Sequence, residues 1–285
     1  MMEALLFVLL PALAHGGGGG GAAVVTARCP DPTDCTSSLQ TAFDTAGATL
    51  VRVPLLPGNQ PWIVGDQSGG PTSIDPRVQA NASGIMLGPA SSHRTIVFAG
   101  GVQVLAKQGA FHHGQFFIGV NGSNITILGR GAVWRMRKRD YSNPKMYAHS
   151  EDRHALALYG CSDITIIGLL ISSSGGDGIY MTGLTSTGGS DNLMGYCRNI
   201  VLDSVVCDDH YRQGMSVISV VGLRVVNSTF SNTNGTPPSS GVDFEPVSVS
   251  YCDITQPLML HMLCVACRTT TTTGWKASIL KVPVF

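Results

Sequence analysis

Charge is scarce in this chain of 285 residues: charged residues make up 13%, and 18 Lys and Arg balance 18 Asp and Glu. A formal net charge of zero argues against nucleic acid as a partner, because binding to a phosphate backbone needs an excess of basic residues. No apolar run reaches the roughly 18 residues that cross a bilayer, so no membrane span is expected. Aromatic residues are also few, at 7%, whereas glycine is abundant, with 35 residues. Together with the many Val, Ile, Ser and Thr residues, this glycine content favours short strands joined by turns.

The N-terminal residues have the pattern of an export signal. Residues 1–14 form a short apolar run that ends in Ala-Leu-Ala, which predicts a secretory signal peptide. Residues 15–28 follow as a Gly-rich segment, expected to be a flexible spacer. Five Asn-X-Ser/Thr sequons and eight cysteines fit a secreted, glycosylated protein. Cys29 and Cys35 are close enough in sequence to staple the N-terminal loop, whereas Cys161, Cys197 and Cys207 are expected in the core, with or without pairing.

Helical periodicity occurs once. Residues 36–46 place Leu39, Ala42, Phe43 and Ala46 at helical spacing, which predicts an amphipathic helix. After this segment the chain alternates short apolar strands with turn residues, and two strand types recur in the same order about every 23 to 39 residues. The first type spans residues 124–129, 163–168, 199–204 and 222–227; the second spans residues 155–160, 178–183, 214–219 and 241–246. Recurrence of this kind predicts a solenoid, in which each turn buries its apolar face against the next.

The motifs GGDGIYMTG, CDDHYRQGMSVIS and GVDFEP each follow such an aliphatic strand. In this combination the chain resembles the pectin-lyase-like superfamily over residues 29–246. The resemblance implies an all-β fold, a right-handed parallel β-helix, with the segment at Leu39 and Phe43 as an N-terminal capping helix. The superfamily contains polygalacturonase-like glycoside hydrolases, polysaccharide lyases and uronate epimerases. Of the polygalacturonase motifs, only Asp177 and the pair Asp208-Asp209 carry over; Arg212-Gln213-Gly214 stands where Gly-His-Gly is expected.

Stacking of the second strand type aligns side chains into columns. Alignment of Gly160 with Gly183 places His154 over Asp177, and Gln213 and Ser240 continue that column. Within the strands, the alternation predicts two outward-facing columns, one of Tyr180, Ser216 and Asp243 and one of Thr182, Ile218 and Glu245. One side of the stack is therefore expected to collect His154, Asp177, Asp208, Asp209, His210, Arg212, Asp243 and Glu245. For each single carboxylate, a turn residue that bonds its own backbone is an equally good interpretation.

Glycosidic hydrolysis needs one carboxylic acid and a second carboxylate, so this set favours a glycoside hydrolase that acts on a polysaccharide without a cofactor. The candidate catalytic residues are Asp177, Asp208, Asp209, Asp243 and Glu245, and the candidate substrate-binding residues are Arg153, His154, Tyr180, His210 and Arg212. The protein is expected to be a monomer.

Two alternatives stay open. In a calcium-dependent lyase or uronate epimerase, Asp177, Asp208, Asp209 and Asp243 would bind Ca²⁺, and Arg212 or His210 would remove a proton. The third class is a non-catalytic β-helix that binds carbohydrate or serves a structural role. Incubation with polysaccharides distinguishes them: hydrolysis yields reducing ends without unsaturated uronates, and elimination yields unsaturated uronates. An epimerase is detected by sugar analysis with NMR, and a non-catalytic protein binds without any turnover.

Two further segments carry predictions. The loop of residues 135–153 is rich in Lys and Arg and contains Tyr141 and Tyr147. It is interpreted either as an arm that contacts a sugar chain or as a solvated surface loop. Residues 247–285 lack the repeat, which predicts a segment foreign to the fold, from a truncated or misjoined chain.

Overall fold

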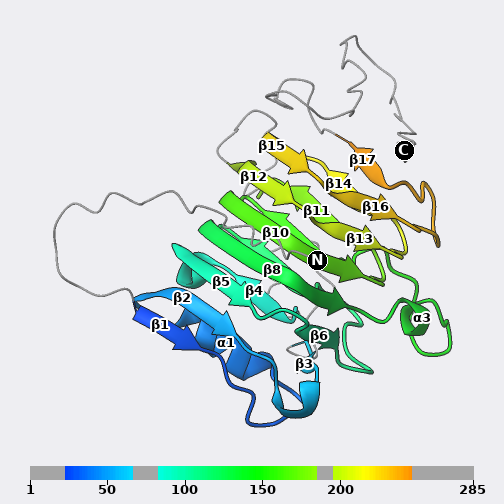
Figure 1. The fold of residues 1–285 in the computed structure, drawn as a ribbon. Coiled ribbons are helices and arrows are strands. Elements are labelled where there is room, and N and C mark those ends of the chain that lie inside the picture. Colours follow the sequence, from blue (N-terminus) through cyan, green and yellow to red (C-terminus); the bar gives the residue numbers. More distant parts are fainter. Residues whose placement is uncertain (1–22, 67–82, 185–194, 246–285) are drawn as a thin grey trace, which may run out of the picture.

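The computed structural model describes residues 23–66, 83–184 and 195–245. The expected signal peptide, residues 1–14, and the C-terminal segment, residues 247–285, lie outside these ranges. The described chain is mostly β, and all of its strand pairings are parallel. The strands form one 11-stranded and one 6-stranded sheet (Figure 1).

The 11-stranded sheet has the main order β1-β2-β5-β8-β10-β12-β15 and includes β3, β6, β13 and β16. Its strands are β1 (Ala23–Thr26), β2 (Ala48–Val53), β3 (Trp62–Val64), β5 (Arg94–Phe98), β6 (Gln103–Ala106), β8 (Ser123–Arg135), β10 (Ser162–Ser172), β12 (Cys197–Asp203), β13 (Val206–Asp208), β15 (Val220–Val226) and β16 (Thr229–Ser231). The 6-stranded sheet contains, in spatial order, β4 (Ile85–Leu87), β7 (Phe117–Val120), β9 (Leu156–Tyr159), β11 (Ile179–Thr182), β14 (Met215–Val217) and β17 (Val242–Phe244).

From β4 onward the chain passes repeatedly between the two sheets, so that strands of one type lie side by side. Ile125, Ile164, Ile200 and Leu223 are register partners on successive strands, and all four are buried. In the smaller sheet, Ile179, Met215 and Val242 are aligned in the same way. These registers confirm the alignment predicted from the repeat. Each turn buries its aliphatic side chains against its neighbours, which is the main stabilising contribution in such a stack.

A left-handed residue near the start of each of four strands, β8, β10, β12 and β15, explains why Asn, Asp or Gly opens the first repeat element. Asn124, Asp163, Asn199 and Gly222 all have positive φ values, between 51° and 76°. This left-handed conformation is least costly for Gly and, among other residues, for Asn and Asp. Asn199 Nδ2 also donates to Asp163 Oδ1 at 2.9 Å, which links two successive turns.

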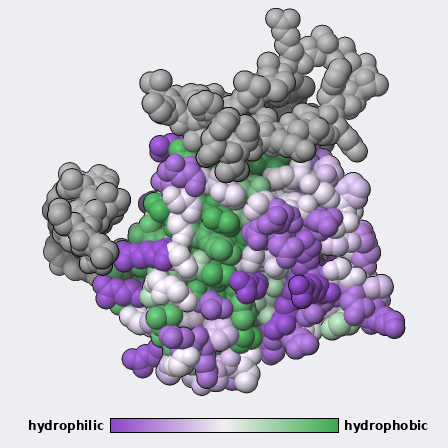
Figure 2. Space-filling model, turned by 45° about the vertical axis from the view of Figure 1, so that its right-hand side comes forward, coloured by the Kyte–Doolittle hydropathy of each residue, from purple (hydrophilic) through white to green (hydrophobic). Residues whose placement is uncertain are grey.

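Aromatic residues fill the interior near the middle of the stack. The rings of Phe117 and Trp134 are parallel with centroids 3.6 Å apart, and Phe98 packs edge-on against Trp134 at 5.6 Å. All three side chains are fully buried. On the face shown in Figure 2, hydrophobic residues form a band next to a strongly hydrophilic area.

The predicted helix is α1 (Thr36–Asp44), which ends two residues before Ala46. Leu39, Ala42 and Phe43 form its buried face, as the spacing indicated, and the helix packs against β2 and β4. It lies at the end of the stack that contains β1 and β2 (Figure 1). A disulfide between Cys29 and Cys35 immediately precedes the helix, which confirms the expected staple.

The expected spacer of residues 15–28 is corrected at its C-terminal end. Ala23–Thr26 form β1, which pairs in parallel with β2. The β-branched residues Val24 and Val25 favour this strand, and only two alanines separate them from the glycine run. The remaining helical elements are short: η1 (Pro57–Asn59), η3 (Pro89–Ser91) and α3 (Lys138–Tyr141). Within the described ranges, no helix has the length and apolar character to cross a membrane.

Candidate functional site

A column of polar side chains, here called the polar ladder, links the turns that precede the strands of the smaller sheet. Each member lies two residues before a strand and on the next turn from its neighbour: Ser83, Gln115, His154, Asp177, Gln213 and Ser240. Backbone N–H groups donate to the side chain one turn earlier, from Gln115 to Ser83 at 3.0 Å, from His154 to Gln115 at 2.8 Å, from Asp177 to His154 at 2.9 Å and from Ser240 to Gln213 at 3.0 Å. The predicted alignment of His154 with Asp177, Gln213 and Ser240 is thus confirmed.

His154 and Asp177 are the titratable members of the polar ladder. His154 Nδ1 accepts the Asp177 N–H, and burial together with the nearby Arg212 charge lowers the pKa of His154 to about 3. The imidazole is therefore neutral at physiological pH, with its proton assigned to Nε2. The Asp177 side chain is fully buried, and this burial raises its pKa to about 7, although Arg212 opposes the shift. A carboxyl with such a pKa can exchange a proton near neutral pH.

Arg212 binds three carboxylates. Its Nη1 lies 3.4 Å from Asp177 Oδ2, its Nε 3.1 Å from Glu151 Oε2 and its Nη2 3.8 Å from Glu245 Oε2. Burial lowers the pKa of Arg212, but the charges of Asp177, Glu245 and Glu151 outweigh it and raise the pKa overall. Arg212 therefore stays protonated and joins a buried carboxyl to two carboxylates that are each about two-fifths exposed.

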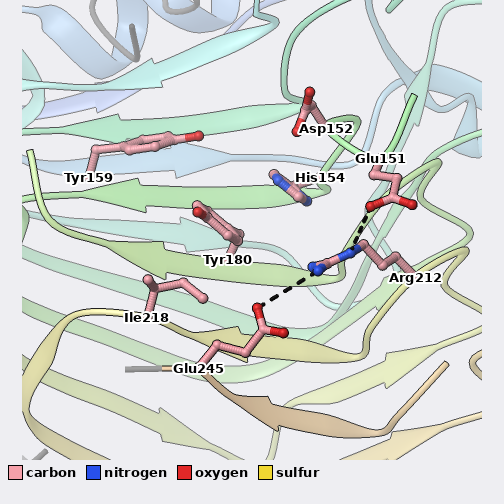
Figure 3. Close-up of a pocket in the computed structure, with 8 residues that line it drawn as sticks. All are labelled: Glu151, Asp152, His154, Tyr159, Tyr180, Arg212, Ile218 and Glu245. Carbon is pink, nitrogen blue, oxygen red and sulfur yellow. Dashed lines mark ion pairs between the residues drawn. The ribbon is translucent and has the colours of Figure 1, made fainter. Parts of the chain in front are cut away.

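A pocket of about 300 Å³ opens beside Arg212 (Figure 3). One part of its wall is aromatic. The rings of His154 and Tyr180 are parallel with centroids 4.5 Å apart, and the ring centroid of Tyr159 lies 5.9 Å from that of Tyr180. Ile218 adds an apolar contact, and Glu151, Asp152 and Glu245 supply carboxylates. Aromatic rings beside carboxylates can hold the face of a sugar and exchange protons with its oxygen atoms.

The structure brings four of the predicted residues to this pocket: His154, Tyr180, Arg212 and Glu245. Asp177 lies against Arg212 but does not line the pocket. Sequence reasoning missed Glu151, Asp152 and Tyr159. Tyr159 pairs with Thr182, so it extends the predicted column of Thr182, Ile218 and Glu245 by one turn and could have been found by that alignment. Glu151 and Asp152 come from an irregular loop, for which the repeat gives no register.

Asp243 and Ser216 occupy the predicted column with Tyr180. They were expected to face outward, yet Ser216 is fully buried and Asp243 is 7% exposed. Asp243 Oδ2 accepts a hydrogen bond from Gln213 Nε2 at 2.7 Å, so the polar ladder covers this carboxylate. An outward direction in the sheet therefore did not mean access to solvent at these two positions.

The side chains of Asp208 and Asp209 bond to residues that do not line the pocket. Asp208 Oδ1 accepts hydrogen bonds from Ser231 Oγ and Asn232 Nδ2, both at 2.7 Å. Asp209 accepts from Lys138 Nζ at 2.6 Å and from Ser173 Oγ at 3.0 Å. Both side chains thus bond to side chains of neighbouring turns and to Lys138.

His210 is fully buried. Its Nδ1 lies 2.8 Å from Ser174 Oγ, and burial lowers its pKa to about 4. Gly178 leaves space for this ring, because a Cβ at that position would lie 2.5 Å from His210 Nε2. His210 therefore packs between turns as a neutral residue and does not line the pocket.

Arg153 is 1% exposed and organises the loop of residues 135–153 from within. It donates to the carbonyls of Phe111 at 2.9 Å, His112 at 3.0 Å and Ala148 at 2.8 Å. Its guanidinium also lies 5.6 Å and 5.3 Å from the ring centroids of Tyr141 and Tyr147, which are both buried. These tyrosines therefore pack on Arg153 and offer no face to a sugar chain.

The four aspartates of the calcium alternative, Asp177, Asp208, Asp209 and Asp243, do not point to one common site. Their side chains contact different groups: Arg212, the pair Ser231 and Asn232, Lys138, and Gln213, respectively. Across the described ranges, no three His, Cys, Asp or Glu side chains are arranged to hold a metal ion. These four residues therefore do not form one ligand set.

The chain matches no protein-family model and no curated protein. It is similar to a solved structure, that of a proposed glycosyl hydrolase from Parabacteroides merdae, with 13% sequence identity and a TM-score of 0.48. The match covers 83% of this chain and 100% of the other. A likeness at this level does not identify an activity, so the function is inferred from the pocket.

Proposed function

We propose that the protein is a carbohydrate-active enzyme that hydrolyses glycosidic bonds in the pocket beside Arg212. One observation carries the proposal: Arg212 holds two partly exposed carboxylates, Glu151 and Glu245, next to an aromatic wall. Since both carboxylates bind one rigid guanidinium, their oxygen atoms lie within about 9 Å of each other, a limit that accommodates inverting and retaining glycosidases alike.

In this proposal, Glu151 and Glu245 share the two carboxylate roles. One protonates the oxygen of the leaving sugar, and the other activates water or attacks the anomeric carbon. Asp177 contacts Arg212 from the buried side and is a positioning residue. Tyr180, which is partly exposed, supports the sugar ring through its apolar face, and the buried Tyr159 packs beside it.

We expect Glu245→Gln and Glu151→Gln each to lower turnover by about 10²-fold, because an amide can neither donate nor accept the catalytic proton. The full-length protein is incubated with neutral, amino-bearing and uronate polysaccharides, and new reducing ends are measured. Asp163→Asn is the matched control: Asp163 is exposed, lies outside the pocket and has a positive φ that Asn also tolerates. Hydrolysis that survives in both Gln variants would refute these roles, and absorbance of unsaturated uronates would instead identify a lyase.

Asp209→Asn is expected to leave turnover within about twofold of the wild type and to cost less than about 1 kcal/mol of stability, since its ion pair with Lys138 is partly exposed. Reducing-end assays and urea unfolding measure the two quantities. A large loss of turnover with unchanged stability would restore Asp209 as a catalytic candidate.

We also propose that the fold is a right-handed parallel β-helix of the pectin-lyase-like type. The parallel registers and the regular passage between two sheets support this proposal. An extracellular location is proposed on two observations: the Cys29–Cys35 disulfide, and exposed asparagines at the sequons of Asn121, Asn124, Asn227 and Asn234. Expression in a secreting eukaryotic cell, followed by glycosidase treatment and mass measurement, tests both location and glycosylation.

A further inference from the structure

The pocket carries an excess of negative charge. Three of its lining residues, Glu151, Asp152 and Glu245, are acidic, whereas Arg212 is its one basic lining residue. His154 adds no positive charge, because burial keeps its pKa at about 3. The buried carboxyl of Asp177 lies directly beneath Arg212 and increases the imbalance whenever it is ionised. A ligand that enters the pocket therefore meets a net negative potential.

The single positive charge is already engaged. Three nitrogens of Arg212, Nε, Nη1 and Nη2, each lie next to a carboxylate oxygen, at 3.1, 3.4 and 3.8 Å. A uronate sugar would bring a further carboxylate to the same guanidinium. It would have to displace Glu151 or Glu245 or remain close to like charges, and either event is unfavourable.

The aromatic wall offers the complementary site. Figure 3 shows the rings of Tyr159, His154 and Tyr180 between Asp152 on one side and Glu245 on the other. An ammonium group within about 6 Å of an aromatic ring is attracted to its π face, and nearby carboxylates strengthen the attraction. The pocket therefore offers an organic cation both aromatic rings and carboxylates.

We infer that the pocket binds a sugar unit that carries a protonated amine, so that the substrate is a polysaccharide of amino sugars. This inference rests on the proposed function and names its substrate class. The sugar lies with its apolar face on Tyr180, and its ammonium group interacts with Glu245, Asp152 or both. Uronate polymers are then excluded by charge, and neutral polymers bind without the electrostatic contribution.

The test compares three oligosaccharides of equal length, made of glucosamine, N-acetylglucosamine or galacturonate, by calorimetric titration of the full-length protein at pH 6. We expect the glucosamine oligomer to bind about tenfold more tightly than its acetylated counterpart at low salt. At 1 M salt this preference should shrink to about twofold or less, because the Debye length falls to about 3 Å. Glu245→Gln should reduce the preference at low salt, whereas the control Asp163→Asn should retain it.

Tighter binding of the galacturonate oligomer, or an amine preference that is absent at low salt, would overturn the inference. The salt series uses the wild-type chain, so the outcome does not depend on whether a variant folds. The inference and the proposed function can fail separately. If the protein cleaves a neutral polysaccharide and shows no preference for the amine, the inference about the substrate is wrong and the proposed hydrolase activity stands. If it binds the amino sugar selectively and cleaves no polymer, the proposed hydrolase activity is wrong and the binding inference stands.

Discussion

Arg153→Ala is expected to lower the free energy of unfolding by about 3 to 4 kcal/mol, because the variant leaves a buried carbonyl without a partner and opens a cavity. The Phe111 carbonyl is the group most affected, since Phe111 is fully buried and Arg153 Nε donates to its oxygen at 2.9 Å. The rings of Tyr141 and Tyr147 lose the guanidinium on which they pack. Urea unfolding, followed by tryptophan fluorescence, measures the loss.

Arg153→Lys serves as the matched variant. Lysine keeps the positive charge, but its single donor nitrogen cannot reach all three carbonyls. We therefore expect a loss of stability smaller than that of Arg153→Ala. If Arg153→Ala unfolds like the wild type but binds oligosaccharide more weakly, Arg153 is a substrate-binding residue, as the sequence suggested, and the structural role assigned to it is wrong.

The difference in the free energy of unfolding between Asp177→Asn and the wild type is expected to change by about 3 kcal/mol, in favour of the variant, when the pH is raised from 5 to 8. The pKa of Asp177 is raised to about 7 by burial, so the folded protein holds this proton more tightly than the unfolded chain does. Stability from this group is therefore complete at a pH below the ordinary value near 3.8 and declines as the pH rises to about 7. An amide does not ionise, so the variant escapes the decline.

Urea unfolding of both proteins at pH 5 and pH 8 gives the required double difference. The buried histidines His154 and His210 have lowered pKa values and change stability in the opposite sense, but they are present in both proteins. The double difference therefore cancels the contribution of His210 and reports on Asp177 together with His154, whose Nδ1 lies 3.5 Å from Asp177 Oδ2. An equal pH dependence of stability in Asp177→Asn and wild type would contradict the raised pKa of Asp177.

The repeat could be predicted from the sequence because each turn places residues of the same type at the same positions. Alternation fixes the face of a side chain within a strand, so the columns of Ile179 with Met215 and of His154 with Asp177 followed from aligned glycines. The helix at Leu39 and Phe43 was predicted for the same reason, since its apolar spacing has one interpretation.

Only some of the residues that line the pocket could be predicted from the sequence. Glu151 and Asp152 lie in a loop whose path depends on Arg153, and the contacts of Arg153 with Phe111 and His112 span about 40 residues of sequence. No local pattern encodes such contacts. Burial of the strand positions Ser216 and Asp243 was missed as well, because strand alternation states a direction and does not reveal what covers it.

The polar ladder has a consequence for how new chemistry can arise on this scaffold. Its members are Ser, Gln, His, Asp, Gln and Ser, and the side chains of Ser83, Gln115, His154 and Gln213 each accept a hydrogen bond from the backbone of the next turn. Any side chain with such an acceptor atom can occupy these positions. A titratable residue can therefore replace a non-titratable one and keep the hydrogen bond between turns. A mutation at such a position can introduce a titratable group next to the pocket while the backbone stays in place, so the same stack of turns can gain, lose or relocate a reactive residue by single substitutions.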